Sequence, residues 1–190
     1  MMGRWRVGDV IGAVVFGLLA GARLRQALAG EAALVVLVAQ AGLAAFLMLA
    51  RRPEKSTASL SQRLTAWGAV LLPFGLQIAD VPPAALWLSV LGVAFSVWGL
   101  LSLGRSFGIA PADRGLVTRG AYRIVRHPMY LGEMASYLAL GLARVSLWNV
   151  LLLALILALF VVRIRWEEAL IAGYETYRSQ VRWRLLPGVW

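Results

Sequence analysis

Six apolar segments, separated by short polar loops, make up most of this chain and restrict what it can fold into. A helix needs about 20 residues to cross a bilayer, within a range of about 17 to 25. We expect the second, fourth and sixth segments to meet this length, the others to be short, and Pro73 to kink the third. The segments are Val7–Ala22, Ala32–Ala50, Leu64–Ala79, Ala84–Leu103, Met129–Ala143 and Leu147–Arg163.

Composition supports a membrane protein. Of the 190 residues, 61% are hydrophobic, and the mean hydropathy is +0.75, whereas a soluble domain is about 45–50% apolar. The chain has no cysteine and one histidine, which excludes disulfides and thiolate chemistry and disfavours a zinc or haem site. We predict an all-α polytopic transmembrane bundle of about five to six spans, with membrane helices in residues 1–103 and the functional region in residues 104–190.

The basic residues predict an orientation. The net charge is +10, from 18 arginines and Lys55. If all six segments cross, every basic residue except Arg23, Arg25 and Arg144 lies on one side, which the positive-inside rule makes cytoplasmic. We expect both termini there, and anionic lipid rather than nucleic acid as the partner of these dispersed arginines. Preference for arginine over lysine is typical of GC-rich bacterial genomes, so we expect a bacterial inner-membrane protein.

The segment LVTRGAYRIVRHPMYLG, from Leu116 to Gly132, contains the first polar cluster suited to chemistry. Proline favours the first turn of a helix and moves the residue before it out of the α region, which predicts His127 at the N-cap of the fifth helix. The free amides and the dipole at that position suit an anionic group. The alternative is a capping or lipid-facing histidine at the headgroup level, and position alone does not separate the two.

A second polar cluster, RIRWEE from Arg163 to Glu168, ends the last apolar segment. Arg163 and Glu167 are four residues apart and share a helix face. The alternative is a snorkelling arginine beside a solvated acidic pair. Adjacent glutamates beside a basic tail indicate a cationic partner, which is either the tail itself or a ligand. Because the two clusters lie at the ends of one helical hairpin, we predict that they form one cytoplasmic pocket.

Other polar segments are less specific. Interfacial tyrosines belong more often to the aromatic belt than to a ligand site; Tyr130, three residues after His127, is the exception. The tail Trp166–Val181 is amphipathic and predicts either a surface helix on anionic lipid or a lid over the pocket. We assign no chemistry to the polar loop Arg51–Ser61.

The two clusters, in this order and followed by VRWRLLP, resemble the isoprenylcysteine carboxyl methyltransferase and phospholipid methyltransferase superfamily. The resemblance runs from about Gly104 to Pro187, and the first three segments match only in kind. It implies a multi-span membrane methyltransferase. Such an enzyme uses S-adenosylmethionine, without a metal, at the cytoplasmic end of the terminal hairpin, and takes a lipophilic acceptor from the bilayer.

The resemblance also implies roles for individual residues. Glu168, joined by Glu167, would bind the cofactor ammonium, Arg163 and Arg126 would face the acceptor, and Glu167 would also serve catalysis. The chain departs from the pattern at Ala121, where many relatives have proline, and at Gln180, where arginine is common. The segment between Glu168 and Tyr174 is also shorter than usual. The residues that would line the cofactor are Val117, Gly120, Tyr122, His127, Tyr130, Leu131 and Gly132.

The expected reaction is methyl transfer to a lipophilic acceptor, most of all a carboxylate of isoprenylcysteine type. A carboxylate needs only a cation such as Arg163 to orient it, whereas a thiol or an amine must first lose a proton to a base such as His127 or a glutamate. A thiol and a phospholipid amine are therefore alternative acceptors. An NADPH-dependent membrane reductase of sterol-reductase type and a non-catalytic membrane protein are alternative functions.

Overall fold

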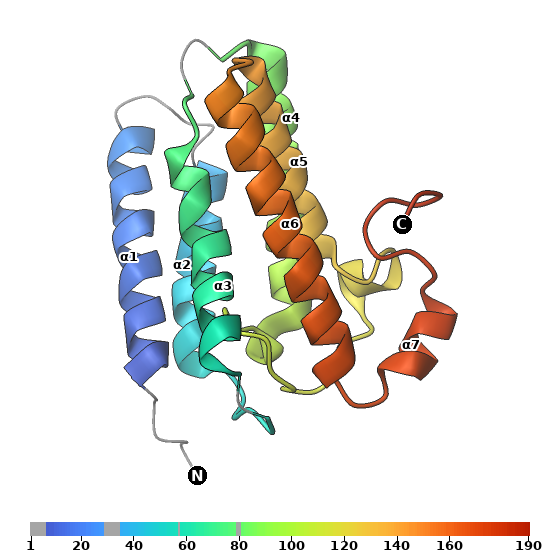
Figure 1. The fold of residues 1–190 in the computed structure, drawn as a ribbon. Helices are drawn as coiled ribbons and strands as arrows, with labels where there is room; N and C mark the ends of the chain where they lie inside the picture. The colour runs from blue at the N-terminus through green and yellow to red at the C-terminus, as the bar shows by residue number, and fades with distance from the viewer. Residues whose placement is uncertain (1–6, 29–34, 57, 79–80) are drawn as a thin grey trace.

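The structure is a computed structural model that describes residues 7–28, 35–56, 58–78 and 81–190. All regular elements in these ranges are helical, which confirms the predicted all-α bundle. Figure 1 shows the long helices α1 to α6 side by side and alternating in direction. The elements are α1 (Val7–Leu28), α2 (Val35–Ala50), α3 (Leu60–Leu71), η2 (Leu72–Gly75), α4 (Pro83–Leu103), η3 (Gly104–Ser106), η4 (Gly120–Arg123), α5 (Pro128–Ala143), α6 (Leu147–Leu170) and α7 (Tyr174–Gln180).

Three of the described helices are long and apolar enough to cross a membrane: α1, α4 with the turn that follows it, and α6. The first segment was expected to be short, but α1 continues through Arg23 and Arg25, whose long side chains can extend toward the headgroups. Helix α2 is a shorter apolar helix from Val35, and residues 32–34 of the second predicted segment lie outside the described residues. The number of crossings made by α2, α3 and α5 stays a prediction.

Helix α3 begins and ends earlier than the apolar pattern predicts. Its start is set by a capping box in which the Gln62 amide donates to Ser59 Oγ (3.2 Å) and the Ser59 amide donates to Gln62 Oε1 (2.9 Å). It ends at Leu71 because Pro73 has no amide hydrogen and continues the chain as the 3-10 turn η2. Pro73 therefore terminates this helix rather than kinking it, and residue 79 of the predicted segment lies outside the described residues.

The tail is divided into two helices, so the single amphipathic helix predicted for Trp166–Val181 was wrong in extent. Helix α6 continues beyond Arg163 to Leu170, which places the RIRWEE cluster on its last turns. The chain then turns at Gly173, whose φ of 78° is favoured by glycine, and α7 begins at Tyr174. The turn brings α7 back beside the end of α6 (Figure 1).

Helices α4 and α5 pack closely through small residues. A Cβ atom on Gly92 would lie 2.7 Å from the carbonyl oxygen of Gly132, and one on Gly99 would lie 2.9 Å from the amide nitrogen of Met129. Ser89 of α4 also shares a hydrogen bond of 2.7 Å with Ser136 of α5. Small residues allow such close approach between membrane helices, and here they hold the start of α5 against α4.

The polar segments gather at one end of the bundle. Figure 1 shows the loop after α2, the loop between α4 and α5, and the junction of α6 with α7 at the same end. This arrangement agrees with the expectation that the motif loop and the tail lie on one side of the membrane. That this side is cytoplasmic stays a prediction.

Candidate functional site

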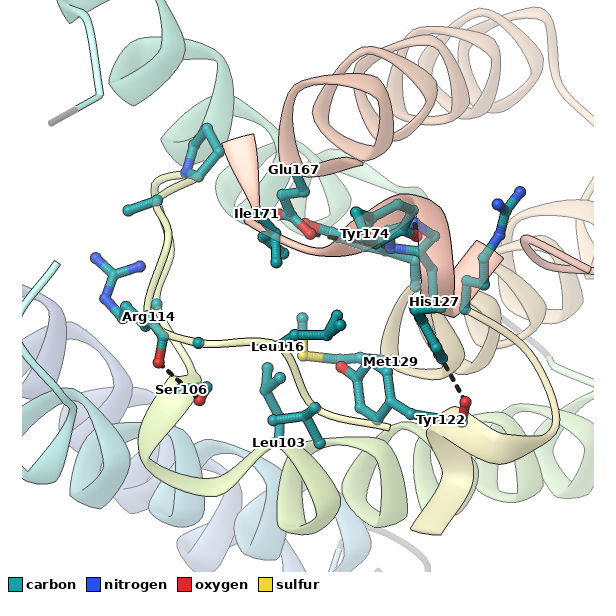
Figure 2. Close-up of a pocket in the computed structure, with 18 of the residues that line it drawn as sticks. Leu103, Ser106, Arg114, Leu116, Tyr122, His127, Met129, Glu167, Ile171 and Tyr174 are labelled. Carbon is teal, nitrogen blue, oxygen red and sulfur yellow. Dashed lines mark hydrogen bonds and ion pairs between the residues drawn. The ribbon is translucent and has the colours of Figure 1, made fainter. Parts of the chain in front are cut away.

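The largest group of sequence-predicted site residues surrounds an open cavity at this polar end of the bundle. The open space of this cavity is about 700 Å³, part of which is continuous with solvent. Figure 2 shows Glu167, Ile171 and Tyr174 on one side of it and Leu103, Leu116 and Met129 on the other. Its lining is Leu103, Ser106, Gly108, Ala110, Pro111, Ala112, Arg114, Gly115, Leu116, Val117, Tyr122, Arg126, His127, Met129, Tyr130, Glu167, Ile171, Tyr174 and Tyr177.

The loop between α4 and α5, which is irregular apart from the short 3-10 helices η3 and η4, forms one wall of the cavity. Gly120 has a φ of 59°, and a Cβ on it would collide with the Ser102 side chain; the next amide, of Ala121, donates to Ser102 Oγ at 3.2 Å. The loop after α2, to which we had assigned no role, supports this wall. Arg114 pairs with Glu54 at 2.9 Å, and the Lys55 amide donates to the carbonyl of Asp113 at 2.9 Å.

His127 lies at the N-cap of α5, as predicted, although its side chain does not cap the helix. Its Nε2 atom is instead 3.2 Å from Glu168 Oε1 and 3.1 Å from the hydroxyl of Tyr174, whose ring stacks beside the imidazole. The histidine is buried at 5% exposure. This excludes the lipid-facing alternative and connects the two sequence clusters directly.

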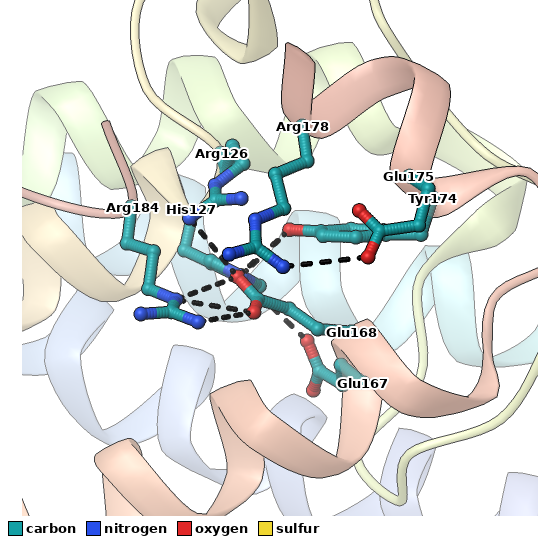
Figure 3. Close-up of polar contacts among 8 residues, drawn as sticks. All are labelled: Arg126, His127, Glu167, Glu168, Tyr174, Glu175, Arg178 and Arg184. Atoms are coloured by element: carbon teal, nitrogen blue, oxygen red, sulfur yellow. Dashed lines mark hydrogen bonds and ion pairs between the residues drawn. The ribbon is translucent and has the colours of Figure 1, made fainter. Parts of the chain in front are cut away.

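Glu168 is the centre of a charged network (Figure 3). Arg184 binds it in a bidentate manner, with Nε 3.0 Å from Oε1 and Nη2 3.0 Å from Oε2. Arg126 Nη2 lies 3.6 Å from Oε1, and the Tyr174 hydroxyl donates to the same oxygen at 3.1 Å. The tail itself therefore provides a cationic partner for the acidic pair, and Glu168 lies behind the cavity lining rather than in it.

The tail is also joined to the motif loop through the backbone. The amide of Arg126 donates to the carbonyl of Trp183 at 2.8 Å, and that of His127 to the carbonyl of Arg184 at 2.9 Å. The amide of His127, at the N-cap where an anionic ligand was expected, is thus already occupied. Sequence reasoning missed Arg184, although an arginine in the VRWRLLP motif beside two glutamates was a usable signal.

Arg126 is the clearest candidate for binding an anion. Its side chain lines the cavity and is 4% exposed. Among the described residues, its Nε and Nη1 atoms have no hydrogen-bond partner. A buried guanidinium with unsatisfied donors is costly, so an anionic ligand in the cavity would complete its hydrogen bonding.

Glu167 supplies the opposite charge on the cavity lining. It accepts a hydrogen bond from the Tyr130 hydroxyl, and its Oε2 atom lies 3.9 Å from His127 Nδ1. Arg163, expected to face the acceptor, lies under the Tyr130 ring at 5.0 Å and donates from Nη2 to the carbonyl of Ile109 at 2.9 Å. It is buried and is not part of the lining.

The other sequence-predicted residues divide into two groups. Val117, Tyr122 and Tyr130 line the cavity together with His127. Gly120, Leu131 and Gly132 do not: Gly120 shapes the loop, Leu131 packs against an apolar core, and Gly132 lies at the contact with α4. These three positions support the cavity through packing.

Tyr174 and Tyr177, interfacial tyrosines for which the aromatic belt is the more common role, are buried in the site. The Tyr177 hydroxyl donates to the carbonyl of Tyr122 at 2.6 Å, which joins α7 to the motif loop. Burial raises the pKa of both Tyr174 and Tyr177 above the ordinary tyrosine value, and the charge of Glu168 adds to the effect. Both hydroxyls therefore stay protonated and act as donors.

A second cavity, the membrane-side cavity, lies between α1, α2, α3, η2, α4 and α5. Its open space is about 1150 Å³, part of which is continuous with solvent, and its lining is mostly apolar. Met129 lines both cavities. Leu103 from the first lining and Leu100 and Phe107 from the second pack with Met129 in one apolar cluster.

Comparison with known proteins agrees with the sequence motifs. A family model described as phospholipid methyltransferase matches residues 81–178, which extend from the approach to α4 into α7. Phosphatidylethanolamine N-methyltransferase of Mus musculus is 33% identical over 104 residues, which cover 47% of this chain and 50% of the mouse protein. The chain thus spans about half the length of this curated relative. These matches confirm the superfamily resemblance drawn from the two motifs.

Proposed function

Because this chain belongs to the phospholipid methyltransferase family, we propose that it is an integral membrane methyltransferase that uses S-adenosylmethionine and methylates a lipid acceptor. The observation that carries the proposal is the arrangement of charge in the first cavity. Arg126 is buried there with two unsatisfied nitrogens, and Glu167 provides a carboxylate on the same lining. A zwitterionic ligand of moderate size satisfies both groups.

The residues present fit S-adenosylmethionine. Its amino-acid part carries a carboxylate, which Arg126 would bind, and an ammonium, which Glu167 would bind. We assign the ammonium to Glu167 rather than to Glu168, because Glu168 is already paired with Arg184 and Arg126. Apolar side chains for the adenosine come from the loop and the end of α4.

The contribution of the protein to this reaction is mainly positioning. The bound cofactor supplies an electrophilic methyl group, and in-line transfer requires the acceptor atom to be aligned with it, which accounts for much of the acceleration in such reactions. Glu168 fixes His127 and Tyr174 through hydrogen bonds. Helix α7 is joined to the motif loop by Tyr177, and its residues Tyr174 and Tyr177 form that side of the cavity lining.

For the acceptor, the structure and the comparison favour a lipid-like amine. The named substrate of the mouse relative, phosphatidylethanolamine, is an amine, and the membrane-side cavity contains a carboxylate, Glu133. A carboxylate acceptor of isoprenylcysteine type is the second candidate. The observation that favours it is Arg163, whose buried Nε atom has no hydrogen-bond partner among the described residues.

The test of the proposed function is calorimetric binding of S-adenosylhomocysteine to the detergent-purified full chain. Wild-type protein should bind it, and Arg126→Met should weaken binding by at least about tenfold, which is 1.4 kcal/mol. Arg178→Met is the matched control, because Arg178 lies on α7, is 55% exposed and pairs only with Glu175 among the described residues. Folded wild-type protein that binds no S-adenosylhomocysteine would overturn the proposal, and binding of NADPH instead would indicate a reductase.

A further inference from the structure

Glu133 is a carboxylate inside the membrane-side cavity. It lies on α5, and its Oε1 atom accepts a hydrogen bond of 3.3 Å from Gln40 Nε2 of α2. The same Gln40 nitrogen lies 3.2 Å from Ser96 Oγ of α4. Among the described residues, Glu133 Oε2 has no hydrogen-bond partner. Ionisable groups at membrane depth are costly and usually serve a function, so the free oxygen requires an explanation.

The position of Glu133 relative to the first cavity suggests a function for this oxygen. Met129, which lines both cavities, precedes Glu133 by one helical turn on α5, so the two side chains share a face. A group resting against Glu133 is therefore one helical turn from Met129, a residue that also lines the proposed cofactor site.

Resting on the proposed function, we propose that Glu133 is a further catalytic residue, which binds the protonated amine of a lipid-like acceptor and removes the proton that the amine must lose. In this step one N–H bond breaks and an O–H bond forms on the Glu133 carboxylate. The nitrogen lone pair then forms the new N–C bond to the methyl group while the S–C bond breaks. The electron pair of the S–C bond stays on the sulfur, which becomes that of S-adenosylhomocysteine. Gln40 holds the carboxylate in place through Oε1 and leaves Oε2 for the amine.

The surroundings of Glu133 fit this role better than a purely structural one. The charged and titratable groups that interact electrostatically with Glu133 are Arg163 and Glu167 on α6, Tyr130 and Tyr137 on α5, and Tyr122 in η4. Arg23 of α1 lines the same cavity. Gln40 of α2, which donates to Glu133, and Ser96 of α4, which contacts Gln40, are both neutral. A strut between helices needs only a hydrogen-bond acceptor, which a glutamine side chain also provides. Proton removal needs the carboxylate, so Glu133→Gln separates the two roles.

The binding experiment uses dodecylamine, with dodecanol as the uncharged probe and dodecanoate as the acidic one, on the full chain in detergent. Wild-type protein should bind dodecylamine, and Glu133→Gln should weaken this binding by at least about tenfold without changing the binding of dodecanol. Ser136→Ala, which alters a hydroxyl on the lining of the same cavity, is the matched control. Equal binding of dodecylamine by Glu133→Gln and wild type, or preference of wild type for dodecanoate, would overturn the inference.

The kinetic experiment measures transfer of a labelled methyl group from S-adenosylmethionine to dodecylamine. Loss of a general base costs about 10²- to 10⁴-fold, and the deficit of Glu133→Gln should shrink as the pH rises and the amine becomes neutral in solution. A deficit that does not change with pH would contradict proton removal. Binding of S-adenosylhomocysteine, expected to be equal in both proteins, separates the hypotheses: its absence from wild type refutes the proposed function, whereas its presence without a Glu133-dependent amine site refutes only this inference.

Discussion

Replacing Glu168 with glutamine should destabilise the protein more than replacing its partner in the tail, Arg184, with glutamine. Glu168 and Arg126 have side-chain exposures of 11% and 4%, so the substitution leaves a buried guanidinium beside a neutral amide. Removing one partner of a buried ion pair costs about 3–5 kcal/mol, and we expect about 3 kcal/mol because glutamine keeps the shape and one acceptor. Arg184 is 25% exposed, and because water replaces part of its interaction, Arg184→Gln should cost only about 1.5 kcal/mol.

The assay is unfolding by sodium dodecyl sulfate in mixed micelles, followed by far-ultraviolet circular dichroism without cofactor. Arg178→Gln, which removes an exposed pair with Glu175, should stay within about 0.5 kcal/mol of wild type. The double variant Glu168→Gln with Arg126→Met should recover part of the loss, because no buried charge is then left unpaired. The reasoning would be refuted if Glu168→Gln were as stable as wild type, or if Arg184→Gln were the more destabilising change. The buried pair of Glu168 and Arg126 would then not be the main contribution of this network to stability.

Two further predictions concern packing and topology. Gly132→Ala should destabilise the bundle by about 1–3 kcal/mol in the same unfolding assay, because the added Cβ meets the backbone of α4, whereas Gly42→Ala, with nothing within 4 Å, should be neutral or stabilising. Cysteines introduced by Thr118→Cys and Thr176→Cys should be labelled from one side of the membrane and Val145→Cys from the other, with no background because the native chain has no cysteine. Labelling of positions 118 and 176 from opposite sides would refute the alternating arrangement of helices.

Much of the fold follows from local patterns. Hydrophobic segments bounded by polar loops predicted the helices, and a proline after His127 predicted its position at the start of α5, because these are short-range effects of solvation and backbone sterics. The boundaries that were missed depend on side-chain chemistry at the ends. The capping box at Ser59 started α3 early, and the turn at Gly173 divided the tail.

The site was predicted less completely, because its contacts join residues distant in sequence. The two motifs indicated a common pocket, yet only the folded chain shows that Arg184 engages Glu168 and so leaves Glu167 on the cavity lining. Glu133 was overlooked since a single acidic residue in an apolar segment carries no local pattern that assigns its partner. Its contact with Gln40 depends on how α2 and α5 pack, which the periodicity of either segment does not determine.

The backbone contacts between the tail and the motif loop have a consequence for biogenesis. The amides of Arg126 and His127 are synthesised and delivered to the membrane well before the carbonyls of Trp183 and Arg184 that accept their hydrogen bonds. During translation, the motif loop with its arginines is therefore made before the tail that joins it. These backbone contacts can form only after residue 184 has left the ribosome, so we expect a chain stalled earlier to lack the join between the tail and the motif loop.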